Sequence, residues 1–204
     1  MITIINYGSG NVLAFVNVYN RLNIPVAVAN TAAVLAGATR LILPGVGSFD
    51  RAMEQLDASG MRATLEQLVT EQRMPVLGIC VGMQMLAKRS DEGRLDGLGW
   101  IDGTVRKFDL TKLPRGTNLP HMGWNDVAPH AKGGLFKGLE QDARFYFLHS
   151  YYFDCAQETS VLAHTDYGPA FHCAVRRENV YGVQFHPEKS HHFGSQLLSN
   201  FTEV

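Results

Sequence analysis

Apolar and polar positions along the first ninety residues follow two alternating patterns. Short apolar runs have the length of buried strands, and the stretches between them repeat apolar residues at spacings of three and four, which is typical of helices. This alternation predicts a largely parallel sheet with helices on both faces. The predicted strands are residues 1–5, 25–30, 40–44 and 75–79, and the predicted helices are residues 12–22, 49–72 with a break near Gly60, and 80–90.

The second half of the chain has a different pattern. From Trp100 to about Val183, short β-like segments are separated by Gly, Pro, Asn and Asp turns. We interpret these segments as a more antiparallel extension of the same sheet, closed by a helix from about residue 190 to residue 201. The predicted fold is an α/β, three-layer, mostly parallel sheet flanked by helices, formed by a single domain over residues 1–204.

Composition narrows the class of protein. Of the 204 residues, 46% are hydrophobic and 18% are charged, which is ordinary for a globular chain with a sizeable core. The formal net charge is -1 and no long run of like charges occurs, so we expect binding neither to nucleic acid nor to an anionic membrane. No apolar run approaches the ~20 residues of a membrane-spanning helix, and the N-terminus lacks the pattern of a signal peptide.

The cysteines and histidines bear on metal binding and redox setting. Cys80, Cys155 and Cys173 are too few and too widely spaced for a disulfide framework, which predicts free thiols in a reducing, cytoplasmic setting. No pair of cysteines has the spacing of zinc ligands, and the adjacent His191 and His192 do not share a face of a helix. We therefore expect neither a metal nor a cofactor.

The most informative segment runs from the fourth predicted strand into a helix. Cys80 lies at the junction between Gly78 and Gly82, in the G-x-C-x-G form of the nucleophile elbow. An abrupt strand-to-helix turn exposes a nucleophile above the sheet edge, and the glycines let the chain pack closely enough to make it. The N–H of Val81 would then face an oxyanion formed during attack on a carbonyl. The alternative is a small cysteine buried behind the strand.

A second strand end carries a candidate base. Residues 181–185 have the pattern of a buried strand, His186 follows it, and Pro187 ends it. Glu188 lies two residues after His186, and residues so spaced project to the same side of an extended segment, so the carboxylate can orient the imidazole. A cysteine nucleophile needs such a base to hold its proton and later to protonate the leaving amine. Taken alone, His-Pro-Glu is more often a simple turn.

The third predicted strand runs into a loop with two glycines, Pro44-Gly45-Val46-Gly47. Glycines at these positions allow a backbone direction that turns amide N–H groups toward a ligand. A phosphate-binding P-loop is excluded because no Gly-Lys-Ser/Thr follows. A tight strand-to-helix turn without any ligand remains the alternative.

Together, these three segments resemble the class I glutamine amidotransferase family over essentially the whole chain. The most specific matches are Gly-Ile-Cys-Val-Gly-Met-Gln at residues 78–84 and His-Pro-Glu at residues 186–188. The resemblance implies a flavodoxin-like fold and hydrolysis of L-glutamine through a γ-glutamyl thioester on Cys80, with His186 and Glu188 completing a catalytic triad. It also implies an oxyanion site formed by Val46, Gly47 and Val81, and a substrate site formed by Gln84, His149, Ser150 and Tyr151.

Two further stretches, residues 120–125 and 186–190, resemble the subgroup that supplies ammonia for imidazole glycerol phosphate formation in histidine biosynthesis. The resemblance implies a separate (β/α)8-barrel cyclase subunit as heterodimer partner, since no part of the chain looks like an acceptor-binding domain. Ammonia would pass directly into that subunit, and glutamine hydrolysis would be very slow without it. Residues at or near the partner interface would be Asn11, Met122, Trp124 and Lys189.

Several alternatives stay open. Residues 191–194, His-His-Phe-Gly, resemble paralogues that feed ammonia into amino-sugar biosynthesis for surface polysaccharides, with the same triad and a different acceptor. Trp124 could be a core tryptophan before a turn, and His149 could be a strand-end histidine satisfied within the protein. A cysteine peptidase or a non-catalytic protein on a similar scaffold would leave Gln84 without a purpose. The remaining alternative is a pure binding module.

Overall fold

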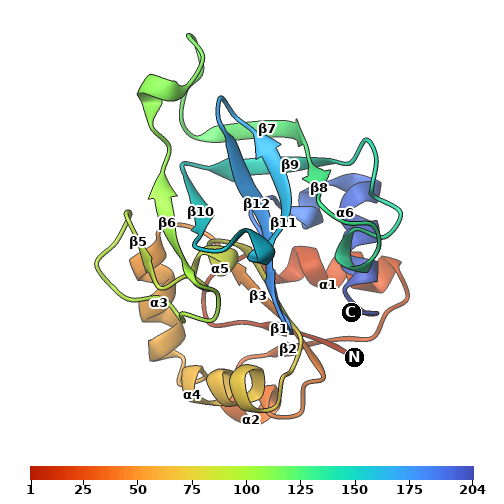
Figure 1. Cartoon of the computed structure of the whole chain (residues 1–204). Helices are drawn as coiled ribbons and strands as arrows, with labels where there is room; N and C mark the ends of the chain where they lie inside the picture. Colours follow the sequence, from red (N-terminus) through yellow and green to blue (C-terminus); the bar gives the residue numbers. More distant parts are fainter.

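The apolar runs predicted as strands lie side by side at the centre of the molecule (Figure 1). In the computed structural model, which describes residues 1–204, β1 (Ile2–Ile5) pairs in parallel with both β2 (Val26–Ala29) and β3 (Arg40–Gly45). β3 pairs in parallel with β4 (Val76–Cys80). Strands β1, β3 and β4 are buried along nearly their whole length, as expected for continuous apolar runs covered on both faces.

A strand from the C-terminal end joins this parallel group. β13 (Val180–Val183) pairs in parallel with β4, with Gly182 opposite Gly78 and Val183 opposite Ile79. The segment predicted as part of the antiparallel extension therefore pairs in parallel on one side, with β4, and antiparallel on the other, with β12. The ends of β4 and β13 meet at one edge of the sheet, which is where the chain places Cys80 and the segment after β13.

The predicted antiparallel extension is present beyond β13. The strand order is β2-β1-β3-β4-β13-β12-β10-β6-β5, and β12 also pairs with β11, which pairs with β8. All pairs from β13 to β6 are antiparallel. The strands of the extension are β5 (Arg89–Ser90), β6 (Gly103–Lys107), β8 (Ala128–Pro129), β10 (Tyr151–Cys155), β11 (Val161–Asp166) and β12 (Ala170–Arg177).

One part of the second half does not belong to this sheet. β7 (His121–Asp126) and β9 (Arg144–His149) form a separate antiparallel pair. The aromatic-rich run from residue 144 to residue 153, predicted as a single segment, changes sheets at Ser150. The run contains no Gly, Pro, Asn or Asp, so it carries no strong turn signal that would show the change of partner.

The helices follow the predicted order with two differences: α2 (Ala32–Leu35) was not predicted, and the helix predicted after the fourth strand is shorter. α1 packs against α6, and α3 packs against α5, on opposite sides of the parallel strands (Figure 1). The helix predicted over residues 80–90 is only α5 (Val81–Gln84), and residues 89–90 instead form β5, which pairs with β6. No helix is long and apolar enough to cross a membrane. The helices are α1 (Val12–Arg21), α2 (Ala32–Leu35), α3 (Phe49–Ala58), α4 (Arg62–Glu66) continued by a π-helix (Gln67–Glu71), α5 (Val81–Gln84) and α6 (His191–Asn200).

Candidate active site

The strained turn predicted around Cys80 is present at the junction of β4 and α5. Cys80 has φ +56° and ψ -115°, a conformation that side-chain-bearing residues rarely adopt. A Cβ atom on Gly78 would lie 2.6 Å from the carbonyl oxygen of Gly82, and one on Gly82 would lie 1.9 Å from the carbonyl oxygen of Leu43. Both glycines are therefore required for the close packing that holds Cys80 in this turn.

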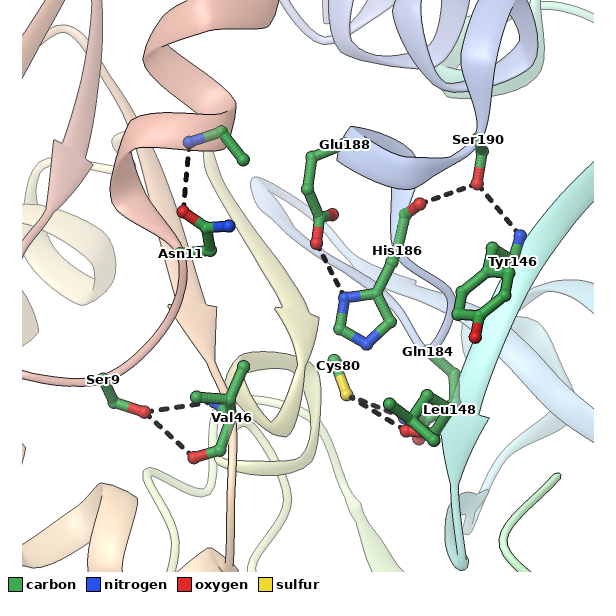
Figure 2. A network of polar contacts seen from close by, with 11 residues as sticks. Ser9, Asn11, Val46, Cys80, Tyr146, Leu148, Gln184, His186, Glu188 and Ser190 are labelled. Atoms are coloured by element: carbon green, nitrogen blue, oxygen red, sulfur yellow. Dashed lines mark hydrogen bonds and ion pairs between the residues drawn. The ribbon is translucent and has the colours of Figure 1, made fainter. Parts of the chain in front are cut away.

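The sulfur of Cys80 is held between two strands. Its thiol contacts the carbonyl oxygen of Leu148 at 3.9 Å, and Nε2 of Gln184 donates to Sγ at 3.7 Å (Figure 2). Gln184 is fully buried and was not singled out from the sequence. A polar residue inside the otherwise apolar segment of residues 180–185 was the available signal, since a buried amide requires a partner.

His186 and Glu188 form a buried hydrogen-bonded pair. Nδ1 of His186 lies 2.8 Å from Oε1 of Glu188, and the two side chains are only 6% and 3% exposed. A carboxylate accepts hydrogen bonds, so Nδ1 carries the hydrogen and Nε2 is left to face the sulfur of Cys80 (Figure 2). The geometry thus places an oriented imidazole between a carboxylate and a cysteine.

Two opposing influences set the protonation of His186. Burial alone would lower its pKa, but hydrogen bonds with Cys80 and Glu188 and the charges of both groups outweigh it and raise the pKa to about 10. His186 is therefore held as an imidazolium at neutral pH. That form can donate a proton to a leaving amine.

A buried serine fixes the turn that carries this pair. Oγ of Ser190 donates to the carbonyl oxygen of His186 at 2.6 Å and accepts from the N–H of Tyr146 at 3.0 Å. The N–H of His186 in turn donates to the carbonyl oxygen of Tyr146 at 2.8 Å. The first bond lies within the turn after β13 and the other two tie this turn to β9, so the position of the imidazole depends on both sheets; Figure 2 shows the two bonds of Ser190.

In the loop after β3, the first candidate donor to an oxyanion, the N–H of Val46, already donates a hydrogen bond within the protein. The N–H of Val46 donates to Oγ of Ser9 at 3.1 Å, and the Ser9 hydroxyl also lies 3.1 Å from the Val46 carbonyl oxygen (Figure 2). The hydroxyl of Tyr7 donates to the carbonyl oxygen of Pro44 at 2.7 Å and anchors the start of the loop. Gly47 has φ +86°, so this position favours glycine.

Gln84 donates both of its amide hydrogens to groups within the protein. Its Nε2 donates to the carbonyl oxygen of Tyr151 at 3.2 Å and to Oε1 of Gln184 at 3.0 Å. Because Gln184 donates to Cys80, hydrogen bonds run without a break from the Tyr151 carbonyl to the sulfur. The atom that Gln84 still offers to a ligand is its acceptor Oε1.

Both ring nitrogens of His149 are hydrogen-bonded within the protein, which was one of the two alternatives for this residue. Its Nδ1 lies 2.7 Å from the Tyr151 carbonyl oxygen and must donate to it, so Nε2 accepts from Nδ1 of His121 at 3.0 Å. Nε2 of His121 then accepts from the amide of Asn125 at 3.2 Å. Burial lowers the pKa of His149 to about 3 and that of His121 to about 4, so both rings are neutral. The sequence did not indicate His121.

These groups surround one cavity of about 330 Å³, within the range of ~300–1,000 Å³ common for small-molecule sites. Every residue predicted for the triad, the oxyanion site and the substrate site lines it except Glu188, which lies behind His186. The lining residues are Val46, Gly47, Cys80, Val81, Gln84, Glu92, Pro120, Leu148, His149, Ser150, Tyr151, His186 and Lys189.

The residues predicted for a partner interface are exposed around this cavity. Met122 is 62% and Trp124 is 41% exposed, so Trp124 is not a core residue; its ring stacks on His191 with centroids 5.4 Å apart. Lys189 is exposed at the rim. Asn11 is exposed and also caps α1, since its side chain accepts from the N–H of Ala14.

Comparison with known proteins identifies the family. The family model described as glutamine amidotransferase class-I matches residues 3–204. The chain therefore belongs to the class I glutamine amidotransferase family, as its motifs and site geometry indicated. Solved structures agree on the fold: a glutamine amidotransferase aligns with a TM-score of 0.74 at 20% identity, covering 99% of this chain and 97% of that one.

Within the family, curated relatives point to one subgroup. The chain is 62% identical over 204 residues to a Bdellovibrio bacteriovorus protein named imidazole glycerol phosphate synthase subunit HisH, with all of both chains covered. A Leptospira interrogans protein of the same name is 48% identical, again with full coverage of both chains. A Pseudomonas aeruginosa protein named imidazole glycerol phosphate synthase subunit HisH 2 is 43% identical over the full length of both chains.

Proposed function

We propose that the chain is the glutaminase subunit of a two-subunit synthase. It hydrolyses L-glutamine to glutamate and ammonia, and it delivers the ammonia to a separate (β/α)8-barrel cyclase that forms imidazole glycerol phosphate in histidine biosynthesis. The observation that carries the proposal is the hydrogen-bonded His186–Glu188 pair beside Cys80, in a chain whose relatives are named as subunits of imidazole glycerol phosphate synthase. The proposal treats residues 1–204 as one domain acting in the cytoplasm.

The first chemical step is acylation of Cys80. The sulfur attacks the side-chain amide carbon of glutamine, and the carbonyl oxygen becomes an oxyanion stabilised by backbone N–H groups of Val81 and of the loop at Val46 and Gly47. The imidazolium of His186 donates its Nε2 proton to the amide nitrogen. The carbon–nitrogen bond then breaks, ammonia leaves, and the γ-glutamyl thioester remains on Cys80.

The second step returns the enzyme to its starting state. Neutral His186 takes a proton from water through Nε2, and the resulting hydroxide attacks the thioester carbon. The sulfur leaves as thiolate, glutamate is released, and His186 is again an imidazolium. Glu188 holds the Nδ1 hydrogen throughout and so keeps Nε2 directed at the reacting atoms.

The far end of the cavity is suited to the amino-acid end of glutamine. Gln84 presents its acceptor Oε1 there, which matches an α-ammonium group, because both of its amide hydrogens are already donated. His149 has no nitrogen left for a ligand, so its contribution is to hold the Tyr151 carbonyl and the backbone of Ser150 in place. Backbone groups of this segment then contact the substrate.

Delivery of ammonia requires an exit from the cavity that is closed to water. Ammonia released into water would be protonated and lost as a nucleophile, so the cavity should open onto the partner subunit. Val46 and Leu148 line the cavity, Met122 lies opposite Leu148 in the β7–β9 pair, and Trp124 lies two residues further along β7. We call these four residues the rim patch; their side chains, in the order Val46, Met122, Trp124 and Leu148, are 47%, 62%, 41% and 37% exposed. An exposed apolar group beside a site is typical of a protein interface.

The bond between Val46 and Ser9 gives a physical reason to expect slow hydrolysis without the partner. A donor engaged by Ser9 cannot stabilise an oxyanion, so the Val46 N–H must be released before it contributes. Val46 is itself in the rim patch, and contact with a partner subunit would act directly on this peptide. Binding of the partner and acceptor ligand therefore activates the glutaminase.

One observation favours a second acceptor of ammonia. Residues 191–194 resemble paralogues of the amino-sugar pathway, and His191 stacks on Trp124 of the rim patch. The triad would be unchanged in that function. Assaying the chain with a histidine-pathway cyclase and with an amino-sugar synthase separates the two, since only the physiological partner should stimulate glutaminase activity.

A glutamine-analogue diazo-ketone tests the proposed nucleophile. It should alkylate Cys80 and neither Cys155 nor Cys173, because burial raises the pKa of both other thiols to about 12 and neither lines the cavity. Peptide mapping by mass spectrometry after labelling, with excess glutamine as competitor, identifies the site. Labelling elsewhere, or labelling of Cys80 that glutamine does not slow, would contradict the proposal.

A further inference from the structure

Three histidines gather on an outer face of the antiparallel extension, away from the catalytic cavity. His164 on β11 lies directly opposite His172 on β12. His130 follows β8, and its backbone N–H donates to the carbonyl oxygen of Leu162 on β11. Side chains along β11 alternate between a buried face and an outer face, and His164 belongs to the outer one. None of the three histidines lines the catalytic cavity.

A carboxylate completes the group. Glu158 lies in the short turn before β11, with its Oε1 4.0 Å from Nε2 of His164 and its Oε2 4.0 Å from Nε2 of His172. Nε2 of His130 contacts Nδ1 of His164 directly. One nitrogen or oxygen donor from each of His130, Glu158 and His164 lies within 4.8 Å of the others.

The sequence alone predicted no metal, because these residues are far apart along the chain; from their meeting in the structure, we propose that His130, Glu158 and His164 bind a divalent transition-metal ion such as Zn²⁺. Imidazole and carboxylate are ligands that zinc takes at about 2.0–2.2 Å, which places two donors of one tetrahedral ion about 3.3 Å apart. His130 and Glu158 are exposed and His164 is partly exposed, so small rotations reach that spacing without disturbing the core. Three protein ligands leave a fourth position for water.

His172 is assigned a positioning role rather than that of a ligand. Its Nδ1 accepts the backbone N–H of Cys155 at 3.1 Å, so the hydrogen of the neutral ring is on Nε2. That N–H faces the carboxylate of Glu158, which is the arrangement that orients a carboxylate ligand from outside the coordination sphere.

The ion would stabilise the segment that contains β8 and His130, which is weakly held to the sheet. β8 is two residues long and pairs with β11 alone, so few backbone bonds hold His130 to the sheet. A metal shared by His130, on one side of β11, and Glu158, before it, ties this segment to the extension. An ion that binds the folded chain and not the unfolded one raises the unfolding temperature.

Titration calorimetry with Zn²⁺ on the full chain tests the site, in a Cys80→Ser background that removes the catalytic thiol as a competing ligand. We expect one ion per chain. His130→Ala and His164→Ala should each weaken binding by roughly tenfold or more, and each tenfold loss corresponds to about 1.4 kcal/mol. His192→Ala, which removes an exposed histidine outside the group, is the matched control and should bind as the parent does.

Thermal unfolding with and without Zn²⁺ gives a second readout. At one fixed Zn²⁺ concentration, the ion should raise the unfolding temperature of the parent and of His192→Ala by the same amount, and that of His130→Ala by clearly less. Mg²⁺, which prefers oxygen ligands, should have no such effect. Absence of Zn²⁺ binding by the parent, or equal binding by all the variants, would overturn the proposal.

Discussion

Gln184 donates a hydrogen bond to the sulfur of Cys80 from the segment directly after β13, which also leads into His186. One short segment thus supports the nucleophile and positions its base. Gln184 also accepts from Gln84, so it couples the substrate end of the cavity to the reacting end. We therefore regard it as a positioning residue of the site.

Replacing Gln184 by Met, which is similar in volume and lacks the amide, should lower kcat for glutamine hydrolysis. A hydrogen bond to a charged group contributes about 1.5–3 kcal/mol, so the expected loss is roughly tenfold or more. Steady-state kinetics in the presence of the partner measure it, with thermal unfolding as a check on folding. A variant that folds normally and keeps the parental kcat would show that the bond has no catalytic effect.

Glu188→Gln should lower the pKa of His186, because the substitution removes one of the two negative groups that raise it. In the parent, the imidazolium should persist above the ordinary value of 6.5 and be lost as pH rises through about 10. In the variant, it should be lost at a lower pH. An NMR titration of the His186 ring measures both, and identical titration curves would mean that Glu188 does not stabilise the imidazolium.

Ser9→Ala should increase glutamine hydrolysis by the chain alone. The substitution releases the Val46 N–H from its partner, and a neutral hydrogen bond contributes about 0.5–1.5 kcal/mol, so the gain should be roughly two- to twelvefold. Ser59→Ala removes a hydroxyl that follows α3 and donates to the carbonyl oxygen of Leu56, and it is the matched control. Equal partner-free rates for Ser9→Ala and Ser59→Ala would exclude the Val46 peptide as the point of control.

Gly82→Ala should destabilise the fold as well as the site. Its Cβ would lie 1.9 Å from the Leu43 carbonyl oxygen, a backbone atom that cannot rotate away, so we expect a loss of roughly 3 kcal/mol in unfolding free energy. Gly37→Ala has its nearest neighbour at 3.7 Å and should change stability by about 0.5 kcal/mol or less. Urea denaturation of the two variants measures the difference in their unfolding free energies. Equal values would show that the turn relaxes around the added methyl group.

Local patterns predicted the parallel strands, the Cys80 turn and the His186–Glu188 pair. Each of these depends on residues close together in the sequence, such as glycines two residues from Cys80 or a carboxylate two residues from His186. To predict that these residues lie close together in space, we needed one further assumption, namely that the strand ends share an edge of the sheet. The pairing of β13 with β4 provides that edge.

Contacts between residues far apart in the sequence could not be predicted from such patterns. Nothing near Ser9 in the sequence indicates that its hydroxyl engages Val46, and nothing near His121 indicates a bond with His149. The switch of the chain between sheets at Ser150 likewise depends on which strands are available as partners. These features decide how the cavity is gated and which of its groups are free.

The central claim is that Cys80 makes ammonia for chemistry on another chain. The direct test is synthesis by the complex of Cys80→Ser with the cyclase subunit, with either glutamine or ammonium salt as nitrogen source. We predict that the glutamine-dependent rate is abolished while the ammonia-dependent rate equals that of the parent complex. Loss of both rates would contradict the account, because Cys80 would then be needed for the partner's reaction or for assembly itself.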